Sequence, residues 1–215
     1  MKIAHQAWRF VIPALLVFAG GIWLSGHPGM RFFGTLLADV AMCFALFTLY
    51  FFRDPERPLP TDKGKIYSPG DGTVLSVGRE GNDDGVTLRI FLSIFNVHIQ
   101  RAPCAGRVTN IQEVAGSFAA AMKDEARGNE RVVMTIDPGA GRGRVLVEQI
   151  AGLIARRIEC WPKPGDAVAA GARYGIIYFG SQAAVHFPAG SRCTAKVGDR
   201  MTAGVTEIGE WTSTS

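Results

Sequence analysis

Two runs of β-forming residues flank a Gly-Ser step in the stretch Tyr174-Gly175-Ile176-Ile177-Tyr178-Phe179-Gly180-Ser181-Gln182-Ala183-Ala184-Val185-His186-Phe187-Pro188. Isoleucine, valine and aromatic side chains favour strands, whereas glycine interrupts them. We therefore predict strands over 173–179 and 184–187, with Gly180 and Ser181 between them. A serine in this setting can be a turn residue, a nucleophile for hydrolysis, or the point at which a chain cleaves itself.

The rest of the chain from residue 53 onward shows the same pattern of short apolar or alternating runs between turn residues. The runs cover 72–77, 86–93, 97–101, 106–114, 131–137, 144–150 and 194–197. Many short strands separated by Gly, Pro and Asp-Gly are typical of antiparallel sheet. We predict a mainly β fold, a sandwich or partly closed barrel with short helices. The Ala-rich stretch 118–127 is either a short helix or a lid, and 150–158 is either a helix or a strand.

Two apolar segments, 10–24 and 33–52, precede this β region and are separated by a turn-rich linker at 25–31. A helix of about 20 residues crosses the hydrocarbon core of a bilayer. We predict a membrane-associated helical hairpin over residues 1–52 and a separate domain over 53–215. The alternatives are a cleaved signal peptide or two buried core helices. The distribution of Lys and Arg favours both termini in the cytoplasm, which places the domain on the cytoplasmic side of the cell membrane.

The composition limits the kinds of molecule that the protein is expected to bind. The 215 residues carry a formal net charge of +4 without a dense Lys/Arg run, so a nucleic-acid groove is not expected. Basic residues near the apolar segments suit anionic lipid headgroups instead; these are Arg31, Arg53, Arg57, Lys63 and Lys65. The four cysteines lie far apart in sequence, and no metal site is predicted.

Three motifs supply an Asp, a His and a Ser: Asp71 in 68–73, His98 in 95–103, and Ser181. In a serine hydrolase Asp71 would orient His98, and His98 would take the hydroxyl proton of Ser181. The Gly-x-Ser-x-Gly elbow of α/β-hydrolases is absent because residue 183 is Ala. This hydrolase, tethered to a membrane, is one hypothesis. A carrier-like β domain that binds a lipid or a partner is another.

Self-cleavage is the third hypothesis. The hydroxyl of Ser181 can reach the carbonyl of Gly180 through a five-membered ring, and glycine there offers little steric hindrance. The resulting ester can undergo β-elimination, which leaves Gly180 as a new C-terminus and converts Ser181 into a pyruvoyl group. His98, supported by Asp71, is the base that we expect to activate the hydroxyl.

The order of motifs resembles the short form of phosphatidylserine decarboxylase over nearly the whole chain. The motifs are the apolar hairpin, Ser68-Pro69-Gly70-Asp71-Gly72-Thr73, Asn96-Val97-His98-Ile99-Gln100-Arg101-Ala102-Pro103, Asn129-Glu130-Arg131, the run from Glu148 to Ile158, and Phe179-Gly180-Ser181.

The resemblance implies cleavage into a β chain (1–180) and an α chain (181–215), with a covalent pyruvate, derived from Ser181, as cofactor. It also implies an Asp71–His98 pair and a phospholipid substrate at the membrane, whose amine forms a Schiff base with the pyruvoyl group. The two chains are expected to stay partnered, and homo-oligomerisation is left open.

The chain departs from the family pattern at Phe95, where longer members carry a second histidine, and at Tyr178 and Gln182, where short members often carry arginine. The group that returns a proton to the product is therefore open, and His98 is the first candidate. Arg101 and Arg131 are candidates to pair with phosphate or with the substrate carboxylate.

Overall fold

The computed structural model describes residues 2–80, 85–117, 128–152, 157–178 and 181–212. It divides into two compact units, Met1–Glu56 and Arg57–Ser215. Each unit is described by itself.

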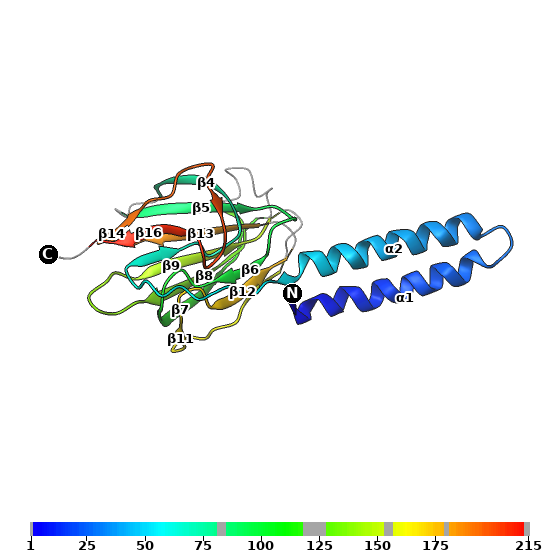
Figure 1. Cartoon of the computed structure of the whole chain (residues 1–215), viewed down its shortest axis with the longest axis horizontal. Helices are drawn as coiled ribbons and strands as arrows, with labels where there is room; N and C mark the ends of the chain where they lie inside the picture. Colours follow the sequence, from blue (N-terminus) through cyan, green and yellow to red (C-terminus); the bar gives the residue numbers. More distant parts are fainter. Residues whose placement is uncertain (1, 81–84, 118–127, 153–156, 179–180, 213–215) are drawn as a thin grey trace. The chain divides into compact units, whose positions relative to one another are not determined.

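The first unit is a helical hairpin, as the sequence predicts (Figure 1). A single 3-10 turn, η1 (His5–Ala7), leads into α1 (Trp8–Ser25), and α2 (Arg31–Phe51) returns alongside it. The ends of the unit are tied together by an antiparallel pair of short strands, β1 (Lys2–Ile3) and β2 (Arg53–Asp54).

Small residues let the two helices approach closely. A Cβ atom added to Gly21 would lie 2.7 Å from the backbone nitrogen of Ala38, and one added to Gly34 would lie 2.3 Å from that of Ser25. The residues buried between the helices include Ala14, Ala38 and other small side chains. Close contact through small residues is the packing that membrane helices use, because lipid supplies no hydrophobic drive for association.

The outer faces of the hairpin are strongly apolar. Leu16, Trp23 and Phe32 are each about 70% exposed. Both helices are long and apolar enough to cross a membrane. Exposed apolar surface of this extent on a hairpin suits a lipid environment better than water.

The second unit is built on an eight-stranded antiparallel sheet with the order β11-β7-β8-β9-β13-β5-β4-β15. Figure 1 shows these strands from β11 at the bottom to β4 at the top. Their bounds are β4 (Gly72–Arg79), β5 (Val86–Leu92), β7 (Gly106–Val114), β8 (Arg131–Asp137), β9 (Val145–Ile150), β11 (Ala167–Val168), β13 (Ser181–Phe187) and β15 (Arg200–Met201).

Two three-stranded sheets complete the unit. One has the order β10 (Ile158–Cys160), β12 (Arg173–Ile177) and β6 (Ile99–Arg101), and the other β14 (Ser191–Cys193), β16 (Glu207–Trp211) and β3 (Lys65–Tyr67). Ile66, Tyr174 and Ile208 of these sheets share one hydrophobic core with Leu88 and Val185 of the large sheet. The mainly β, antiparallel prediction is confirmed.

Most predicted strands are found close to their predicted positions, but the C-terminal part differs. The strand expected over 194–197 is wrong: the chain there forms β14 earlier, at Ser191–Cys193, and β16 later. The strand expected to begin at residue 184 begins at Ser181. Residues 150–158 contain the end of β9 and the start of β10, and 118–127 lie outside the described residues.

Candidate active site

Ser181 is the first residue of β13, which lies between β5 and β9 in the large sheet. It pairs in register with Leu92 at the end of β5, and the next residue, Gln182, pairs with Ile150 at the end of β9. Ser181 is completely buried, and no other atom of the described residues forms a hydrogen bond with its hydroxyl. A buried hydroxyl normally has a partner, so its lack of one marks the position. Phe179 and Gly180 lie outside the described residues.

His98 comes directly before β6 and is also completely buried. Its Nδ1 lies 3.0 Å from the carbonyl oxygen of Asn96. A carbonyl can only accept, so Nδ1 carries the hydrogen and Nε2 is the acceptor nitrogen when the ring is neutral. The backbone oxygen of His98 accepts from the N–H of Ile177, at the end of the strand that leads toward Ser181. His98 and Ser181 therefore lie at the same end of the β unit.

In the described part of the chain, Asp71 binds Arg57 and not His98, the partner that the sequence predicts. The two carboxylate oxygens accept hydrogen bonds from Arg57 at 2.7 and 2.8 Å, and the N–H of Ala203 donates to one of them at 2.8 Å. Among the described residues, Asp71 forms no hydrogen bond with His98, and Ser181 forms none with either. The three residues are thus near one end of the unit without the hydrogen bonds of an assembled relay. Their catalytic roles stay a prediction.

The loop that carries Asp71 is fixed against β6. The carbonyl of Pro69 accepts from the N–H of Arg101, and Ser68 Oγ donates to the carbonyl of Gly70. Arg101 is itself buried and donates to the carbonyl of Gly171. These contacts bring the Ser-Pro-Gly-Asp motif and the strand after His98 together, although about 30 residues separate them in sequence. Arg101 thus has a structural contact, and a role toward phosphate stays a prediction.

A cavity of about 420 Å³ lies at the Ser181 end of the sheet. Arg131 borders it and pairs in register with Ile150, which pairs with Gln182. Adjacent strands lie about 4.8 Å apart, so Arg131 is roughly 10 Å across the sheet from Gln182. The cavity is lined by Glu113, Val114, Ala115, Glu130, Arg131, Val132, Arg157 and Ile158. This mixture of both charges with apolar side chains suits a zwitterionic headgroup.

One wall of this region is a polar cluster beside Tyr178. The hydroxyl of Tyr178 donates to Glu159 at 2.6 Å, and Arg157 Nε lies 3.3 Å from the same carboxylate. The backbone N–H of Tyr178 also donates to the carbonyl of Arg157. Tyr178 is one of the three positions at which the sequence departs from the family pattern. Here it contacts the ion pair of Arg157 and Glu159, three residues before Ser181.

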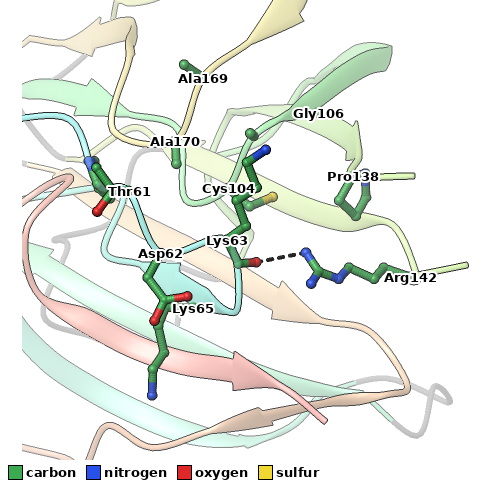
Figure 2. A pocket seen from close by; sticks show the side chains of 12 residues that line it. Thr61, Asp62, Lys63, Lys65, Cys104, Gly106, Pro138, Arg142, Ala169 and Ala170 are labelled. Carbon is green, nitrogen blue, oxygen red and sulfur yellow. Dashed lines mark hydrogen bonds between the residues drawn. The ribbon is translucent and has the colours of Figure 1, made fainter. Parts of the chain in front are cut away.

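A second cavity, of about 460 Å³, lies at the opposite end of β7 and β8 (Figure 2). Gly106 at the start of β7 and Pro138 just after β8 border it, whereas Gln182, the neighbour of Ser181, lies in the row of Val114 at the other end of β7. A strand of nine residues spans roughly 30 Å. Arg142 donates there to the carbonyl of Lys63, and burial raises the pKa of the Cys104 thiol to about 12. This cavity is remote from Ser181.

Sequence reasoning missed two features of the site. It assigned Arg57 to the membrane surface, whereas Arg57 is largely buried and holds Asp71. It also passed over Gln100 and Gln149, two buried glutamines near Ser181. Gln100 lies within a quoted motif, but nothing in the motif shows that its side chain points inward. No local signal marks Arg57.

Comparison with known proteins agrees with this geometry. The phosphatidylserine decarboxylase family model matches residues 44–209. The chain is 44% identical to the phosphatidylserine decarboxylase proenzyme of Symbiobacterium thermophilum, over 96% of this chain and 94% of that protein. It is 37% identical to the proenzyme of the same name from Chlorobium chlorochromatii, over 94% of this chain and 90% of that protein.

A third relative, the phosphatidylserine decarboxylase proenzyme of Desulfotalea psychrophila, is 37% identical over 81% of this chain and 84% of its own length. The matched regions include all the motifs around Asp71, His98 and Ser181. This chain belongs to the phosphatidylserine decarboxylase family.

Proposed function

We propose that this protein decarboxylates phosphatidylserine to phosphatidylethanolamine after it cleaves itself between Gly180 and Ser181. The proposal rests on the family match together with the position of Ser181. Ser181 is fully buried at the start of a central strand, and its hydroxyl has no hydrogen-bond partner among the described residues. The relatives are named as proenzymes, which fits a chain that is processed.

Self-cleavage uses atoms that the chain already holds. Ser181 Oγ forms a bond to the carbonyl carbon of Gly180, its proton goes to a base, and the peptide C–N bond breaks as the nitrogen takes a proton. The ester then loses the Cα hydrogen of residue 181, and the carboxylate of Gly180 leaves. Addition of water and loss of ammonia convert residue 181 into a pyruvoyl group. We assign the base to His98, because Nε2 is the basic nitrogen of its neutral ring when Nδ1 donates to the carbonyl of Asn96.

The surroundings of Ser181 fit a pyruvoyl group. The position is buried, and the group is no larger than the serine it comes from, because the former Cα becomes the ketone carbon and the former Cβ the methyl group. When present, the ketone supplies an electrophile for the substrate amine and an acceptor for the electron pair that the departing CO₂ leaves behind. The protein's own residues bind and orient the lipid: Arg131 and Arg157 border the cavity at this end and offer positive charge to the phosphodiester.

The hairpin supports action on a lipid that stays in its bilayer. Removal of acyl chains from lipid costs about 0.8 kcal/mol per CH₂ group, so a tethered enzyme gains by drawing up only the headgroup. We infer that α1 and α2 hold the protein in the cell membrane with residues 57–215 on the cytoplasmic side. A weak preference for anionic lipid follows from the net positive charge.

The intact mass of the purified protein tests the proposal. We expect two chains, residues 1–180 and 181–215, with a carbonyl in place of the amine at the N-terminus of the shorter one. Ser181→Ala should give one chain of 23.2 kDa that lacks activity. Ser191→Ala is the matched control, because its hydroxyl donates to the carbonyl of Pro188 and takes no part in the site. An uncut wild-type chain that still decarboxylates phosphatidylserine would overturn the proposal, and an uncut chain that hydrolyses esters would favour a serine hydrolase.

A further inference from the structure

Gln100, the middle residue of β6, carries a completely buried amide. Neither its nitrogen nor its oxygen forms a hydrogen bond with any atom of the described residues. An amide offers two donors and one acceptor, and native proteins rarely leave all of them unused in the interior. A buried amide without hydrogen bonds lowers the stability of the folded protein, and the neighbours of Gln100 indicate a function that would explain why it is kept.

The amide of Gln100 faces the neighbours of Ser181. A Cβ atom added to Gly70 would lie 3.2 Å from Gln100 Oε1, 3.3 Å from Leu92 Cδ1 and 3.4 Å from Ala183 Cβ. Leu92 is the register partner of Ser181, and Ala183 follows Ser181 on the same face of β13. The Gln100 amide oxygen, Leu92 and Ala183 therefore surround the space beside Gly70, and Leu92 and Ala183 are neighbours of Ser181 in the sheet.

A second glutamine approaches the same place from the large sheet. Gln149 pairs in register with Ala183, and its amide packs against Gly175, the register partner of Gln100. Gln149 Nε2 donates to the carbonyl of Glu159 at 3.4 Å, whereas its Oε1 is buried and has no hydrogen-bond partner among the described residues. Three buried polar groups with unused hydrogen-bonding capacity, on Ser181, Gln100 and Gln149, thus lie in one region of an otherwise apolar core.

We infer that Gln100 is a positioning residue for self-cleavage at Ser181, an inference that rests on the proposed function. Its amide N–H groups donate to Ser181 Oγ, directly or through one bound water. This contact aims the oxygen at the carbonyl carbon of Gly180 as its proton leaves for the base. The new Oγ–C bond and the broken C–N bond are those of the cleavage step above, and Gln100 itself gains and loses no atoms.

A neutral amide is well suited to this task. A lysine or arginine at the same place would be a buried cation and would need a counter-ion. The amide stays uncharged and holds its donors in place in the core without a counter-ion. The unused hydrogen-bonding capacity in the resting chain is the structural sign of such a role.

The rate of cleavage tests this inference. Full-length chains are synthesised in a cell-free system, and the appearance of the 181–215 chain is followed by mass spectrometry. Gln100→Leu preserves the size of the side chain but removes the donors. We expect it to slow cleavage on the order of tenfold to a hundredfold, because a misplaced reacting atom can cost about a hundredfold in rate. Gln100→Asn retains the amide and should recover part of the rate.

Tyr174→Phe is the matched control. Tyr174 on β12 is equally buried, and its hydroxyl has no hydrogen-bond partner among the described residues, so the change also removes an unsatisfied polar atom from the core. It should cleave at the wild-type rate. The unfolding midpoint of each variant is measured in the Ser181→Ala background, so that every chain is uncut. Gln100→Leu should unfold at the same temperature or higher, because an unpartnered amide has been replaced by an apolar group of similar shape.

Slower cleavage without loss of stability supports the inference. Cleavage of Gln100→Leu at the wild-type rate overturns it, and so does slow cleavage with a lowered midpoint, which would show a purely structural role. A wild-type chain that never cleaves would instead overturn the proposed function, so the two failures are distinguishable.

Discussion

Asp71 and Arg57 form the ion pair that fixes the first of the candidate catalytic residues. The pair is bidentate, and both side chains are almost buried, with 10% and 14% of their surface exposed for Arg57 and Asp71. Arg57 also donates to the carbonyl of Ala203, whose own N–H donates to Asp71. The carboxylate is therefore oriented by three hydrogen bonds. A carboxylate has about four lone-pair sites, so Asp71 can accept a further hydrogen bond from His98 during cleavage without losing these three.

Arg57→Ala should destabilise the protein by about 3 kcal/mol, because it leaves the Asp71 carboxylate buried without its cation. Urea unfolding in the Ser181→Ala background measures this change. Arg144→Ala is the control: Arg144 is 65% exposed and lies 3.7 Å from Asp137, so its loss should cost about 1 kcal/mol or less. If the two variants lose equal stability, Arg57 does not play the role described here.

Residues differ in how far the sequence alone could identify them. Ser181, His98 and Asp71 stand in motifs whose residue types suggest chemistry, so the amino-acid sequence is enough to name them as candidates. Arg57 could not be named in this way, because its partner Asp71 is 14 residues away and the contact depends on how the proline-rich connector folds. Gln100 lies in a three-residue strand whose residues are all buried, so alternation along β6 gave no sign of its direction.

At the scale of elements, the most informative feature is the polar face of β5, β9 and β13. Arg89 and Glu148 flank Ala184 in register and are both more than 90% buried. Arg89 makes a bidentate pair with Glu80, and His186 Nε2 lies 3.0 Å from Glu148. Thr87 completes the group through His186 Nδ1 at 2.9 Å. These charges face away from the hydrophobic core, so the central strands carry a polar cluster on one side.

This cluster predicts a dependence of stability on pH. Burial by itself raises the pKa of Glu148, but His186, Arg89 and Arg131 outweigh it and hold the pKa below its usual value. A carboxyl whose pKa is lower in the folded state stabilises the protein above the unfolded pKa of about 4.3. That contribution is lost as the pH falls through the folded value.

Glu148→Gln should therefore lower the unfolding midpoint at pH 7 and flatten its dependence on pH below about 5. Thermal unfolding of the uncut Ser181→Ala chain between pH 3 and 7 measures both effects. Glu113→Gln is a suitable control, since Glu113 is exposed on β7. A Glu148→Gln midpoint that falls with acid as steeply as that of the unchanged chain would contradict this assignment.

The sequence predicted the positions of those strands in which apolar residues alternate with polar ones between two turns. Examples are Gly106–Val114 and Arg131–Asp137. Apolar alternation did not predict the strands that follow residue 190. Thr194–Val197 alternates like a strand, but β14 and β16 are set by pairing with each other and with β3, which is more than 100 residues distant. Such long-range pairing is not visible in the local sequence.

At the scale of the whole molecule, the division into Met1–Glu56 and Arg57–Ser215 separates the apolar hairpin from the β unit that holds Ser181. The second unit has its own hydrophobic core, whose buried residues all come from positions 66–208. We therefore expect residues 57–215 alone to fold and to cleave at Ser181, because every contact described around that residue lies within the unit.

The truncated protein should lose action on bilayers rather than chemistry. Its rate on vesicles of phosphatidylserine should fall at least tenfold relative to the full chain, whereas its rate on a soluble short-chain phosphatidylserine should stay within about twofold. Flotation with the vesicles reports membrane binding in parallel. An equal rate for both proteins on vesicles would show that α1 and α2 do not serve as the tether.

The position of Ser181 at the head of β13 has a consequence for the protein that the proposed cleavage would produce. Strands β13 to β16 would belong to the shorter product, and β13, β15 and β16 pair with β9, β5, β4 and β3 of the longer one. The two products would share their sheets from the moment the bond breaks, so only the uncut precursor would contain the whole sequence needed to fold. Their separation by heat or denaturant would then be irreversible. Each molecule would have a single opportunity to assemble, and a spent one would have to be replaced by new synthesis.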